Sequence, residues 1–513
     1  MLTIQLDQTG QNGYIYHQIY IKIKEEILNR NLQPHDQLPS KRELADTLNV
    51  SVNSVNGAYQ QLLAEGYLYS VERKGFFVES LETFHESGQL KPSSLPVDLK
   101  EEPIARDDWY SFSHISVDTA NFPFKSWLKS EQKAIHLHQE AFGELPHPQG
   151  VYELRETIAR LIGLARGVKC YPEQLILSAG TQSLIHSLSS ILPADQIYGL
   201  ENPGYRRLYQ MLKNNHHQIE TIGIDQKGVR MSDIHKKQPN VLIITPSHQF
   251  PTGVIMPISR RIQLLNWAAD QPDRYIIEDD YDSEFKYGTD SIPALQSLDR
   301  YDKVIYMGTF SKSLLPGLRL SYMVLPQHLL RRYKEEQHFF IQTANLFTQY
   351  TLLHFIKDGA YQRHIKRMNG LYEEKRKQLI EELNAVFTDN VRIIGENAGL
   401  HFIAEFRSNR TQQEILQRAK ERKLKMYGMD RFTLDEQLPG HQPGFVPLVL
   451  GFSHMRREDI QPAVKRLYDA IFWEIKQPAA LHRQLAYHRS LSTARIDDMS
   501  PGKAVSMSSF LKE

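Results

Sequence analysis

Apolar residues in the first 80 positions follow helical spacing in three separate segments. Between residues 15 and 27 they recur at steps of three and four, which is typical of an amphipathic helix. Ser40, with Glu43 three residues later, forms a capping box that predicts the start of a second helix. Ser51 predicts the start of a third helix, whose apolar face continues to Leu63 and which ends at Gly66.

The segment 67–80 alternates around a charged turn, Glu72, Arg73, Lys74 and Gly75, which predicts a β-hairpin. Two helices, a short turn, a third helix and a hairpin in this order predict a winged helix-turn-helix domain over residues 1–80. Residues 81–108 carry Pro, Ser and charge without a sustained period. They are therefore predicted to be a linker.

Short β-branched runs alternate with helical patterns between residues 109 and 475. Runs such as QLILSAGT, YIIEDDYDSEF and KVIYMGTFSKS predict an α/β fold with a mostly parallel sheet, whose functional residues lie where strands end. From about residue 370, a helical pattern followed by VRIIGENAGLHFIAEF and PLVLGFSHM predicts a smaller α+β domain. Residues 476–513 offer few core positions and are predicted to be a tail, to which no role is assigned.

Composition narrows the classes of partner and compartment. The 513 residues carry 61 Lys or Arg and 60 Asp or Glu, and the net charge of +1 excludes polyanion binding by an overall basic chain. Any DNA contact must therefore be local. The one cysteine, Cys170, excludes an intramolecular disulfide and a cysteine-based metal cluster, and no metal site is expected. No run of about 18 apolar residues occurs, which predicts a cytoplasmic protein without a membrane partner.

The third predicted helix and the hairpin carry side chains suited to DNA. The start of that helix would present five residues to a groove: Ser51, Val52, Asn53, Ser54 and Asn56. Basic or turn residues that would contact phosphates flank it: Lys41, Arg42, Arg73, Lys74 and Gly75. Asn can pair bidentately with adenine, whereas Val offers only apolar contact. Residues 1–80 hold seven Lys or Arg against nine Asp or Glu, so net charge alone does not reveal a DNA-binding domain. A protein-interaction module is the alternative.

The stretch LPSKRELADTLNVSVNSVNGAYQQLLAEGYL resembles the GntR-type DNA-binding signature over its full length. The resemblance implies a double-stranded DNA operator as partner. In that family an Arg commonly follows the Ser that opens the recognition helix, and this Arg tends to touch DNA. Val52 stands at that position here and cannot make the same contact.

Lys312 is the candidate nucleophile of the second module. It follows an apolar strand, where loss of water lowers the pKa of a lysine toward the neutral amine that forms Schiff bases. Nearby hydroxyls and a guanidinium could bind a phosphate dianion, from Thr309, Ser311 and Arg319. A strand-to-helix turn upstream offers backbone N–H groups to the same phosphate, at Gly180, Thr181 and Gln182.

Three further residues fit an aromatic cofactor. Asp279, at the end of a strand, can pair with a pyridinium nitrogen and keep it protonated. Tyr281 lies two residues further on and could bond the phenolic oxygen of the ring, while Tyr205 could stack on its face. Each of these residues alone is more often structural than functional, so the order and spacing of the motifs carry the hypothesis.

The motifs SAGTQ, ENPGY, PSHQFPTG, EDDYDSEF and TFSKSLLPGLR occur in the order typical of fold-type I pyridoxal phosphate (PLP) aminotransferases, which residues 110–475 resemble throughout. The resemblance implies large and small domains and a PLP cofactor, held as an internal aldimine on Lys312. It also implies that Asp279 meets the pyridine nitrogen and that the residues named above hold the phosphate. Phe250 stands where many of these enzymes have an Asn that bonds the phenolic oxygen, which leaves that bond to Tyr281.

Two arginines are candidates to clamp the carboxylate of a ligand. Arg207 follows ENPGY, and Arg431 lies in KMYGMDRF, near where the small domain of these enzymes contributes a carboxylate-binding arginine. A surface or interface ion pair is the alternative for each. His114 and the pair His216 and His217 are interpreted as surface or packing residues.

A winged helix joined by a linker to an aminotransferase-like domain is similar to the MocR-type regulators, over about residues 1–475. Among them, the members that respond to γ-aminobutyrate (GABA) are most similar. The resemblance implies a head-to-tail, domain-swapped homodimer in which GABA displaces Lys312 to form an external aldimine, with its carboxylate on Arg207 and Arg431. It further implies activation of GABA-utilisation genes and repression of the regulator's own gene.

Two alternatives remain open from the residues themselves. A working aminotransferase with a DNA-binding module would use Lys312 and Asp279 equally, although Phe250 favours a weaker catalyst. A MocR-type regulator could instead sense PLP itself or another amino acid, such as D-alanine or taurine.

Overall fold

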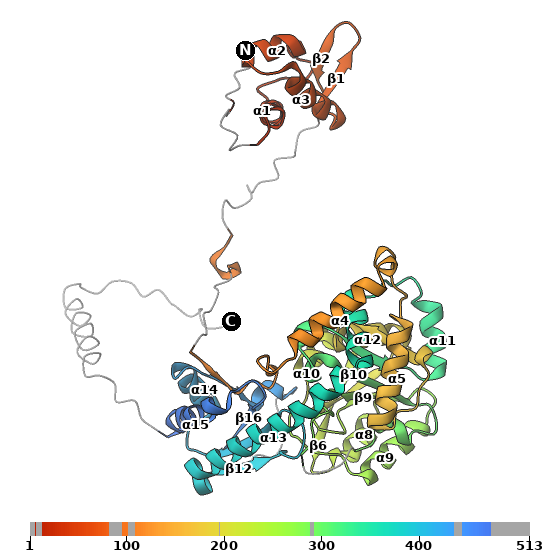
Figure 1. Cartoon of the computed structure of the whole chain (residues 1–513), viewed down its shortest axis with the longest axis vertical. Coiled ribbons are helices and arrows are strands. Elements are labelled where there is room, and N and C mark those ends of the chain that lie inside the picture. The colour runs from red at the N-terminus through yellow and green to blue at the C-terminus, as the bar shows by residue number, and fades with distance from the viewer. Residues whose placement is uncertain are drawn as a thin grey trace, which may run out of the picture. The chain divides into compact units, whose positions relative to one another are not determined.

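The computed structural model describes residues 6, 13–81, 95–100, 108–193, 195–287, 292–435 and 444–472 (Figure 1). The chain divides into two compact units, Met1–Ala105 and Arg106–Glu513, which are taken in turn. The predicted tail 476–513 and most of the predicted linker 81–108 lie outside the described residues. Among the described residues, no helix is long and apolar enough to cross a membrane.

The first unit is a winged helix-turn-helix, as predicted. It consists of α1 (Ile15–Leu28), α2 (Lys41–Leu48), α3 (Val52–Ala64) and the antiparallel hairpin β1 (Leu68–Val71) and β2 (Gly75–Val78), and a short 3-10 turn, η1 (Val97–Leu99), follows. The predicted caps form, because the Ser40 hydroxyl accepts from the Glu43 backbone N–H while the Glu43 carboxylate accepts from that of Ser40. Ser51 caps α3 without a reciprocal bond, since its hydroxyl oxygen accepts from the Ser54 backbone N–H at 3.1 Å.

One apolar core holds the first unit together. Val55, Tyr59 and Leu62 of α3 are completely buried and pack in one cluster with Ile19 and Ile23 of α1. The hydrophobic face of α3 is thus used for packing, which leaves its first turn exposed to solvent.

The second unit contains an eight-stranded sheet in the order β4-β11-β10-β9-β8-β5-β6-β7. Its strands are β4 (Leu175–Ser178), β5 (Ile197–Asn202), β6 (Gln218–Asp225), β7 (Gly228–Val229), β8 (Val241–Ile244), β9 (Tyr275–Asp280), β10 (Val304–Thr309) and β11 (Ser321–Val324). Only β7 and β11 run antiparallel to their neighbours, so the predicted mostly parallel sheet is confirmed.

Helices cover both faces of this sheet, because its strands bury side chains in both directions. On β10, Ile305 packs in one cluster with α6 (Thr181–Ile191), α7 (Arg206–Asn214) and α11 (Gln327–Glu336). Val304 and Tyr306 point to the opposite face, which is covered by α5 (Tyr152–Arg166), α8 (Met231–Lys237), α9 (Ile258–Ala269) and α12 (Leu346–Lys357). Outside these, α4 (Phe124–Leu137) lies along α12 (Figure 1).

The smaller α+β domain is also present. Its sheet has the order β12-β13-β16-β15, formed by β12 (Val391–Ile394), β13 (His401–Arg407), β16 (Phe445–Gly451) and β15 (Tyr427–Gly428). It packs with α14 (Gln412–Glu421) and α15 (Arg457–Ile471), and β3 (Tyr110–Ser111) pairs with β14 (Leu424–Lys425). The helix predicted from about residue 370 is longer than expected: α13 runs from Ala360 to Phe387 because buried positions continue back to Tyr361.

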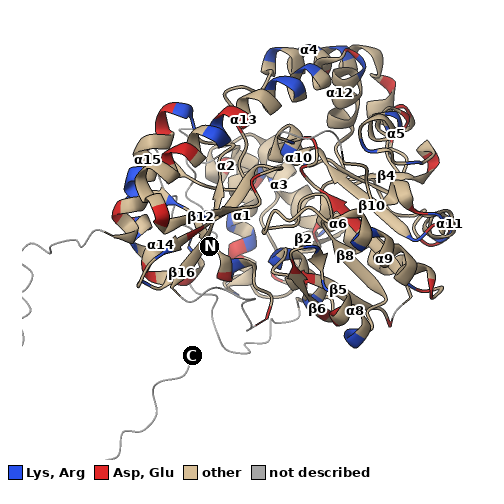
Figure 2. Cartoon of the chain, turned by 90° about the horizontal axis from the view of Figure 1, so that it is seen from below, with Lys and Arg blue, Asp and Glu red and all other residues tan. Residues whose placement is uncertain are grey.

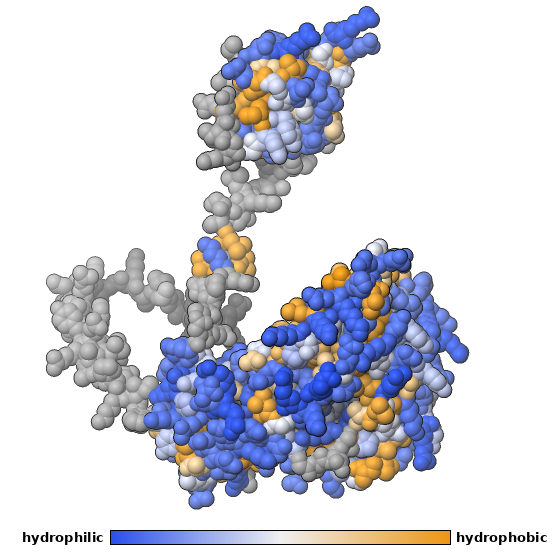
Figure 3. Space-filling model, viewed as in Figure 1, coloured by the Kyte–Doolittle hydropathy of each residue, from blue (hydrophilic) through white to orange (hydrophobic). Residues whose placement is uncertain are grey.

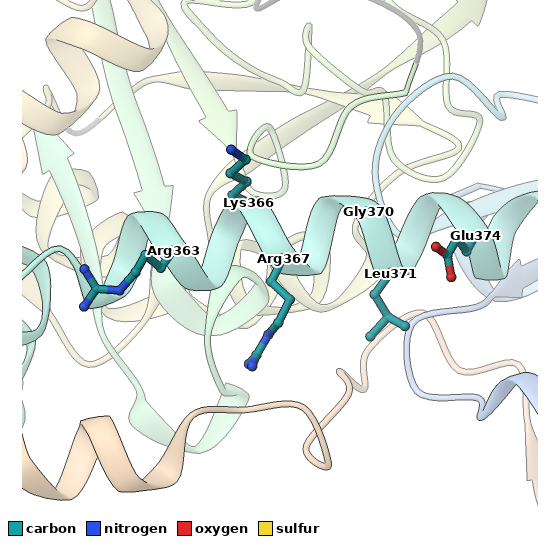
Figure 4. A pocket seen from close by; sticks show the side chains of 6 residues that line it. All are labelled: Arg363, Lys366, Arg367, Gly370, Leu371 and Glu374. Carbon is teal, nitrogen blue, oxygen red and sulfur yellow. The ribbon is translucent and has the colours of Figure 1, made fainter.

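The outer surface of the second unit is mixed in character. Lys, Arg, Asp and Glu are interspersed along α13 and α15 (Figure 2), while apolar surface gathers over α4 (Figure 3). A shallow depression of about 570 Å³ runs along α13 and is lined by Arg363, Lys366, Arg367, Gly370, Leu371 and Glu374. Figure 4 shows Arg367 and Leu371 on the same side of the helix, with Lys366 on the other. None of the predicted cofactor residues lines this depression.

Candidate functional site

Lys312 lies where β10 ends, on the short helix α10 (Phe310–Ser313). Its Nζ donates a hydrogen bond of 2.5 Å to the backbone oxygen of His114. Burial lowers the pKa of Lys312 to about 8, although the nearby Asp282 carboxylate raises it. A larger share of this amine is therefore neutral near pH 7 than for an ordinary lysine, which suits Schiff-base formation.

Asp279 is on the neighbouring strand, where it pairs in register with Met307 of β10. Its Oδ1 is buried and has no hydrogen-bond partner among the described residues. Burial raises the pKa of Asp279 to about 7, and the carboxylates of Asp280, Glu201 and Asp282 raise it further. A buried carboxyl group in this environment favours a cationic hydrogen-bond donor, and a protonated ring nitrogen is such a donor.

The two predicted phosphate-binding segments lie side by side. Gly180, with φ of +110°, precedes α6, and a Cβ there would lie 2.3 Å from Nη2 of Arg319. The same Nη2 donates to the backbone oxygen of Ala179 at 3.2 Å. Only glycine permits this approach of the guanidinium to the start of α6, where no side chain caps the first N–H groups, those of Thr181 and Gln182 among them.

Thr309 and Ser311 complete the same region. The Thr309 hydroxyl oxygen accepts from the Ser311 backbone N–H at 3.2 Å and from the Ser321 hydroxyl at 2.8 Å. Ser321 on β11 pairs with Ser178 on β4, which brings the turn after β4 next to the turn after β10. Hydroxyls, a guanidinium and a helix N-terminus thus come together, which is the donor set that a phosphate monoester needs.

Three aromatic rings line the region between these groups. The rings of Tyr205 and Tyr281 meet that of Phe250 at right angles, with centroids 6.2 Å and 5.9 Å from it. Phe250 has no side-chain donor, so it cannot replace the Asn of the aminotransferases. Tyr281 is instead hydrogen-bonded through its hydroxyl, which lies 3.0 Å from Nδ1 of His248.

Arg207 and Arg431 approach the same place from different domains. Arg207 is on α7, and although burial raises the pKa of the Tyr205 hydroxyl, Arg207 is close enough for its positive charge to lower it. Arg431 is on the 3-10 turn η7 (Met429–Phe432), with its guanidinium 4.5 Å from the centroid of the Tyr427 ring. The turn docks on the loop after β5, because Gly204 N–H donates to Phe432 O at 2.8 Å.

His114 lies among these cations and has a more central position than a surface or packing residue would have. It packs, as interpreted, but inside the site: it is 7% exposed, and its ring contacts those of Phe250, His401, Tyr427 and Phe432. Burial lowers the pKa of His114 to about 3, and the positive charges of Lys312, Arg431 and Arg207 lower it further. A neutral imidazole beside three cations marks the centre of the site. No motif surrounds His114, so the sequence offered no signal for it.

Two other residues were missed inside motifs that had been singled out for their neighbours. His248 precedes Phe250 in PSHQFPTG, and Asp282 follows Tyr281 in EDDYDSEF. Both are 2% exposed, and His248 Nδ1 lies 3.0 Å from Asp282 Oδ2. His216 is exposed and His217 is half-buried against Tyr198, in agreement with their interpretation as surface or packing residues.

The predicted DNA-reading residues occupy the start of α3. Ser51, Val52 and Asn53 are exposed, and Ser54 is half-buried beside Ser51, with their hydroxyls 2.9 Å apart. The Val52 side chain is 43% exposed, so nothing in its own unit accounts for an apolar residue at this position.

The predicted phosphate-contacting residues lie on α2 and on the hairpin turn. Lys41 Nζ donates to Asn56 Oδ1 at 2.6 Å, so the amide nitrogen is the group that Asn56 would offer to a base. Arg42, Arg73 and Lys74 are exposed. Gly75 has φ of +108°, a conformation that closes the wing and that favours glycine.

Family models match both units. The model for class I and II aminotransferases matches residues 112–440, and that for bacterial regulatory proteins of the gntR family matches residues 15–78. The regulator YdeL of Bacillus subtilis is 39% identical over 90% of this chain and 97% of its own. The probable rhizopine catabolism regulatory protein MocR of Rhizobium meliloti is 30% identical over 91% and 95%. The chain belongs to the MocR-type transcriptional regulators.

This MocR-type regulator shares the fold of solved aminotransferases. The multiple substrate aminotransferase of Thermococcus profundus has a TM-score of 0.62 and 23% identity over 71% of this chain and 91% of its own. The kynurenine aminotransferase of Pyrococcus horikoshii has a TM-score of 0.63 and 22% identity over 72% and 92%. The predicted fold class, a winged helix followed by fold-type I large and small domains, is therefore confirmed.

The cofactor of this regulator is pyridoxal 5′-phosphate. The residues present fit it, since the unpartnered Asp279 carboxylate suits the ring nitrogen and the Arg319 region suits the phosphate. When bound, PLP supplies an aldehyde that forms a carbon–nitrogen double bond with an amine. The first unit binds DNA, so the chain is a PLP-dependent transcriptional regulator.

Proposed function

We propose that this regulator senses GABA. Lys312 would hold the cofactor through its amine, and the bound cofactor would supply an aldehyde carbon to which an effector amine could bind in place of Lys312. The effector carboxylate binds Arg207 and Arg431, and DNA contacts change because the ligand prefers one conformation of the protein.

The grouping of Lys312, Arg207 and Arg431 around His114 carries this proposal. A zwitterion with an amine at one end and a carboxylate at the other matches one reactive amine and two guanidinium groups. The imidazole of His114 is neutral there because its pKa is lowered, so it does not compete with the two arginines for the effector carboxylate. Because Arg431 belongs to the small domain and Arg207 to the large domain, a carboxylate that binds both would favour one arrangement of the two domains.

We further propose a head-to-tail homodimer in which each winged helix lies over the partner's aminotransferase-like domain. Support comes from an apolar face of α4, where Phe124, Leu128 and Ile135 are 50%, 54% and 41% exposed. The proposed outcome is that of a GabR-type regulator, with activation of GABA-utilisation genes and repression of its own gene. Sedimentation equilibrium tests the dimer, and a monomer at micromolar concentration would contradict it.

The experiment that tests the effector is a spectral titration of the PLP-loaded protein with a panel of amines. GABA is expected to change the visible absorption at the lowest concentration, followed by shorter and longer ω-amino acids. D-alanine, taurine and L-α-amino acids serve as the comparison. If one of these saturates the change below the GABA concentration, that compound is the effector and the GABA proposal is wrong.

A working aminotransferase is the second candidate, favoured because Lys312 with a lowered pKa and Asp279 with a raised pKa are both present, and such enzymes need both residues. Incubation with GABA and a keto acid distinguishes a regulator from a working aminotransferase. A regulator is expected to complete about one turnover or none per site, whereas sustained production of a new amino acid would identify an enzyme.

A further inference from the structure

A buried polar pair lies directly behind Tyr281 and is not used by the proposed effector chemistry. Nδ1 of His248 is 3.0 Å from the Tyr281 hydroxyl and 3.0 Å from Oδ2 of Asp282. Both His248 and Asp282 are 2% exposed. Nε2 of His248 has no hydrogen-bond partner among the described residues, so the contact through Nδ1 is the one that offsets the cost of burying the imidazole beside a carboxylate.

The geometry points to His248 as the residue that positions the Tyr281 hydroxyl for the phenolic oxygen of the cofactor. Tyr281 would thereby make the bond that an Asn at the position of Phe250 makes in many aminotransferases, with His248 orienting its hydroxyl and Asp282 holding the imidazole in place. The inference rests on the proposed role of Tyr281 at the cofactor, and it adds two residues that neither the sequence motifs nor the effector proposal assigns.

The direction of the hydrogen bonds follows from the donors and acceptors present. An ionised Asp282 can only accept, so Nδ1 of His248 carries the proton and points it toward Oδ2. The Tyr281 oxygen lies at the same distance from that nitrogen and can share its proton as an acceptor. Its own hydroxyl proton then remains available to donate to a phenolate oxygen.

The protonation of Tyr281 agrees with a donor role. Burial raises the pKa of its hydroxyl well above the ordinary value, and the carboxylates of Asp282, Asp279 and Glu201 raise it further. The imidazole of His401 faces the pair from β13, with its ring centroid 5.0 Å from that of His248, and burial holds the pKa of His401 far below its usual range. The groups around Tyr281 thus keep its proton in place.

The backbone leaves room for this pair at one glycine. Gly399 has φ of +72°, and a Cβ there would lie 2.1 Å from Cε1 of His248 and 2.4 Å from Oδ2 of Asp282. Any other residue would push the imidazole or the carboxylate aside. A glycine at the position where any larger side chain would separate His248 from Asp282 is independent support for a specific contact between these two residues.

A metal ion is the competing use of these side chains. The ligand atoms of His248, Asp282 and His401 lie within 4.8 Å of one another. This upper limit by itself admits tetrahedral zinc, with bonds of about 2.0–2.1 Å. Nε2 of His401, however, already lies 3.2 Å from the backbone oxygen of Pro251. The direct His248–Asp282 hydrogen bond is the better account, and zinc is tested below.

The experiment compares four variants of the full-length PLP-loaded protein: Tyr281→Phe, His248→Ala, His248→Asn and His248→Gln. Loss of a donor to the phenolic oxygen raises the pKa at which the visible absorption band changes, because the negative oxygen is less stabilised. We expect Tyr281→Phe and His248→Ala to raise it by about one pH unit and to weaken PLP binding about tenfold. His248→Asn keeps an N–H near Nδ1 and should restore both values, whereas the longer amide of Gln should not.

A double variant separates positioning from a general structural effect. If His248 acts through Tyr281, then His248→Ala adds nothing in the Tyr281→Phe background. Gly399→Ala should reproduce His248→Ala, and the exposed His216→Ala is the matched control. Additive effects in the double variant, or a His248→Ala band identical to that of the unmodified protein, would overturn the inference.

Two further outcomes are distinguishable. If the unmodified protein shows no visible band with PLP, the proposed function fails, whatever the variants do. If zinc stabilises the unmodified protein against heat, and His248→Ala removes that effect while the band is unchanged, the cluster is a metal site and the positioning role is wrong. Thermal unfolding of each variant also shows that His248→Asn and His248→Gln are folded.

Discussion

The two units of this regulator present their functional residues in opposite ways. In the winged helix, the predicted DNA contacts come from one stretch between Lys41 and Gly75, and most of them are exposed. In the aminotransferase-like unit, the site brings together residues from His114 to Arg431, and Lys312 and Asp279 lie half-buried within it. The first unit meets a large charged ligand in water, whereas the second changes the chemistry of its groups by removing water.

This difference indicates which substitutions would impair each function. A side chain at the start of α3 can be exchanged without disturbing the core, since the buried face of α3 lies elsewhere. In the second unit the reactivity of Lys312 depends on burial and on the Asp282 charge, so it depends on how distant segments pack. The predictions below test whether the two units can be altered independently.

The largest effect is expected for Lys312→Ala. Removing the candidate Schiff-base amine should abolish the visible band with PLP and the response to GABA, while operator affinity changes less than about threefold. Absorption spectra measure the visible band and its response to GABA, and a DNA mobility-shift titration measures the operator affinity. Lys366→Ala, at an exposed position on α13, is the control. A GABA response that persists in Lys312→Ala would contradict the proposed mechanism.

Arg431→Ala is expected to weaken GABA binding about 10- to 100-fold, as is typical for loss of a charged hydrogen bond. PLP binding should be unchanged, because the phosphate region lies around Arg319. Spectral titration with GABA measures the GABA affinity, and spectral titration with PLP measures the PLP affinity. Arg456→Ala is a matched control in the same domain, since Arg456 is an exposed arginine paired with Asp459. An unchanged GABA titration would remove Arg431 from the site.

The loading of PLP should depend on pH through the lowered pKa of Lys312. The attacking form is the neutral amine, so the loading rate should rise about tenfold per pH unit below pH 8 and level off above it. A free lysine analogue, with an ordinary pKa near 10.5, should continue to accelerate beyond pH 9. Stopped-flow absorbance follows both reactions. A rate that rises unchanged past pH 9 would show that Lys312 is not perturbed.

The smallest effect is expected on the wing. Arg73→Ala should weaken operator binding several-fold and reduce the slope of log affinity against log salt by about one, as for a lost phosphate contact. The visible band with PLP should stay the same, which tests the independence of the two units from the other direction. Glu72→Ala, at the neighbouring position of the turn, should strengthen binding slightly or leave it unchanged. A salt slope that does not change would place Arg73 outside the DNA interface.

Local rules in the sequence determined the winged helix almost completely. Ser40, Glu43 and Ser51 define helix ends through bonds that span three residues, so no distant part of the chain is needed to predict them. The strand ends that carry Asp279 and Lys312 were likewise visible, since apolar β-branched runs stop there.

Only the tertiary structure decided what surrounds those residues. His114 lies 198 positions before Lys312, and Arg431 lies more than 220 positions after Arg207, so no pattern along the chain joins them. The Tyr281–His248–Asp282 contact likewise depends on the loop after β8 meeting the end of β9, with Gly399 leaving space from a third segment. Caps and apolar periods act over a few residues, whereas burial, charge and proton position are set by whichever side chains the packed fold brings within a few ångströms.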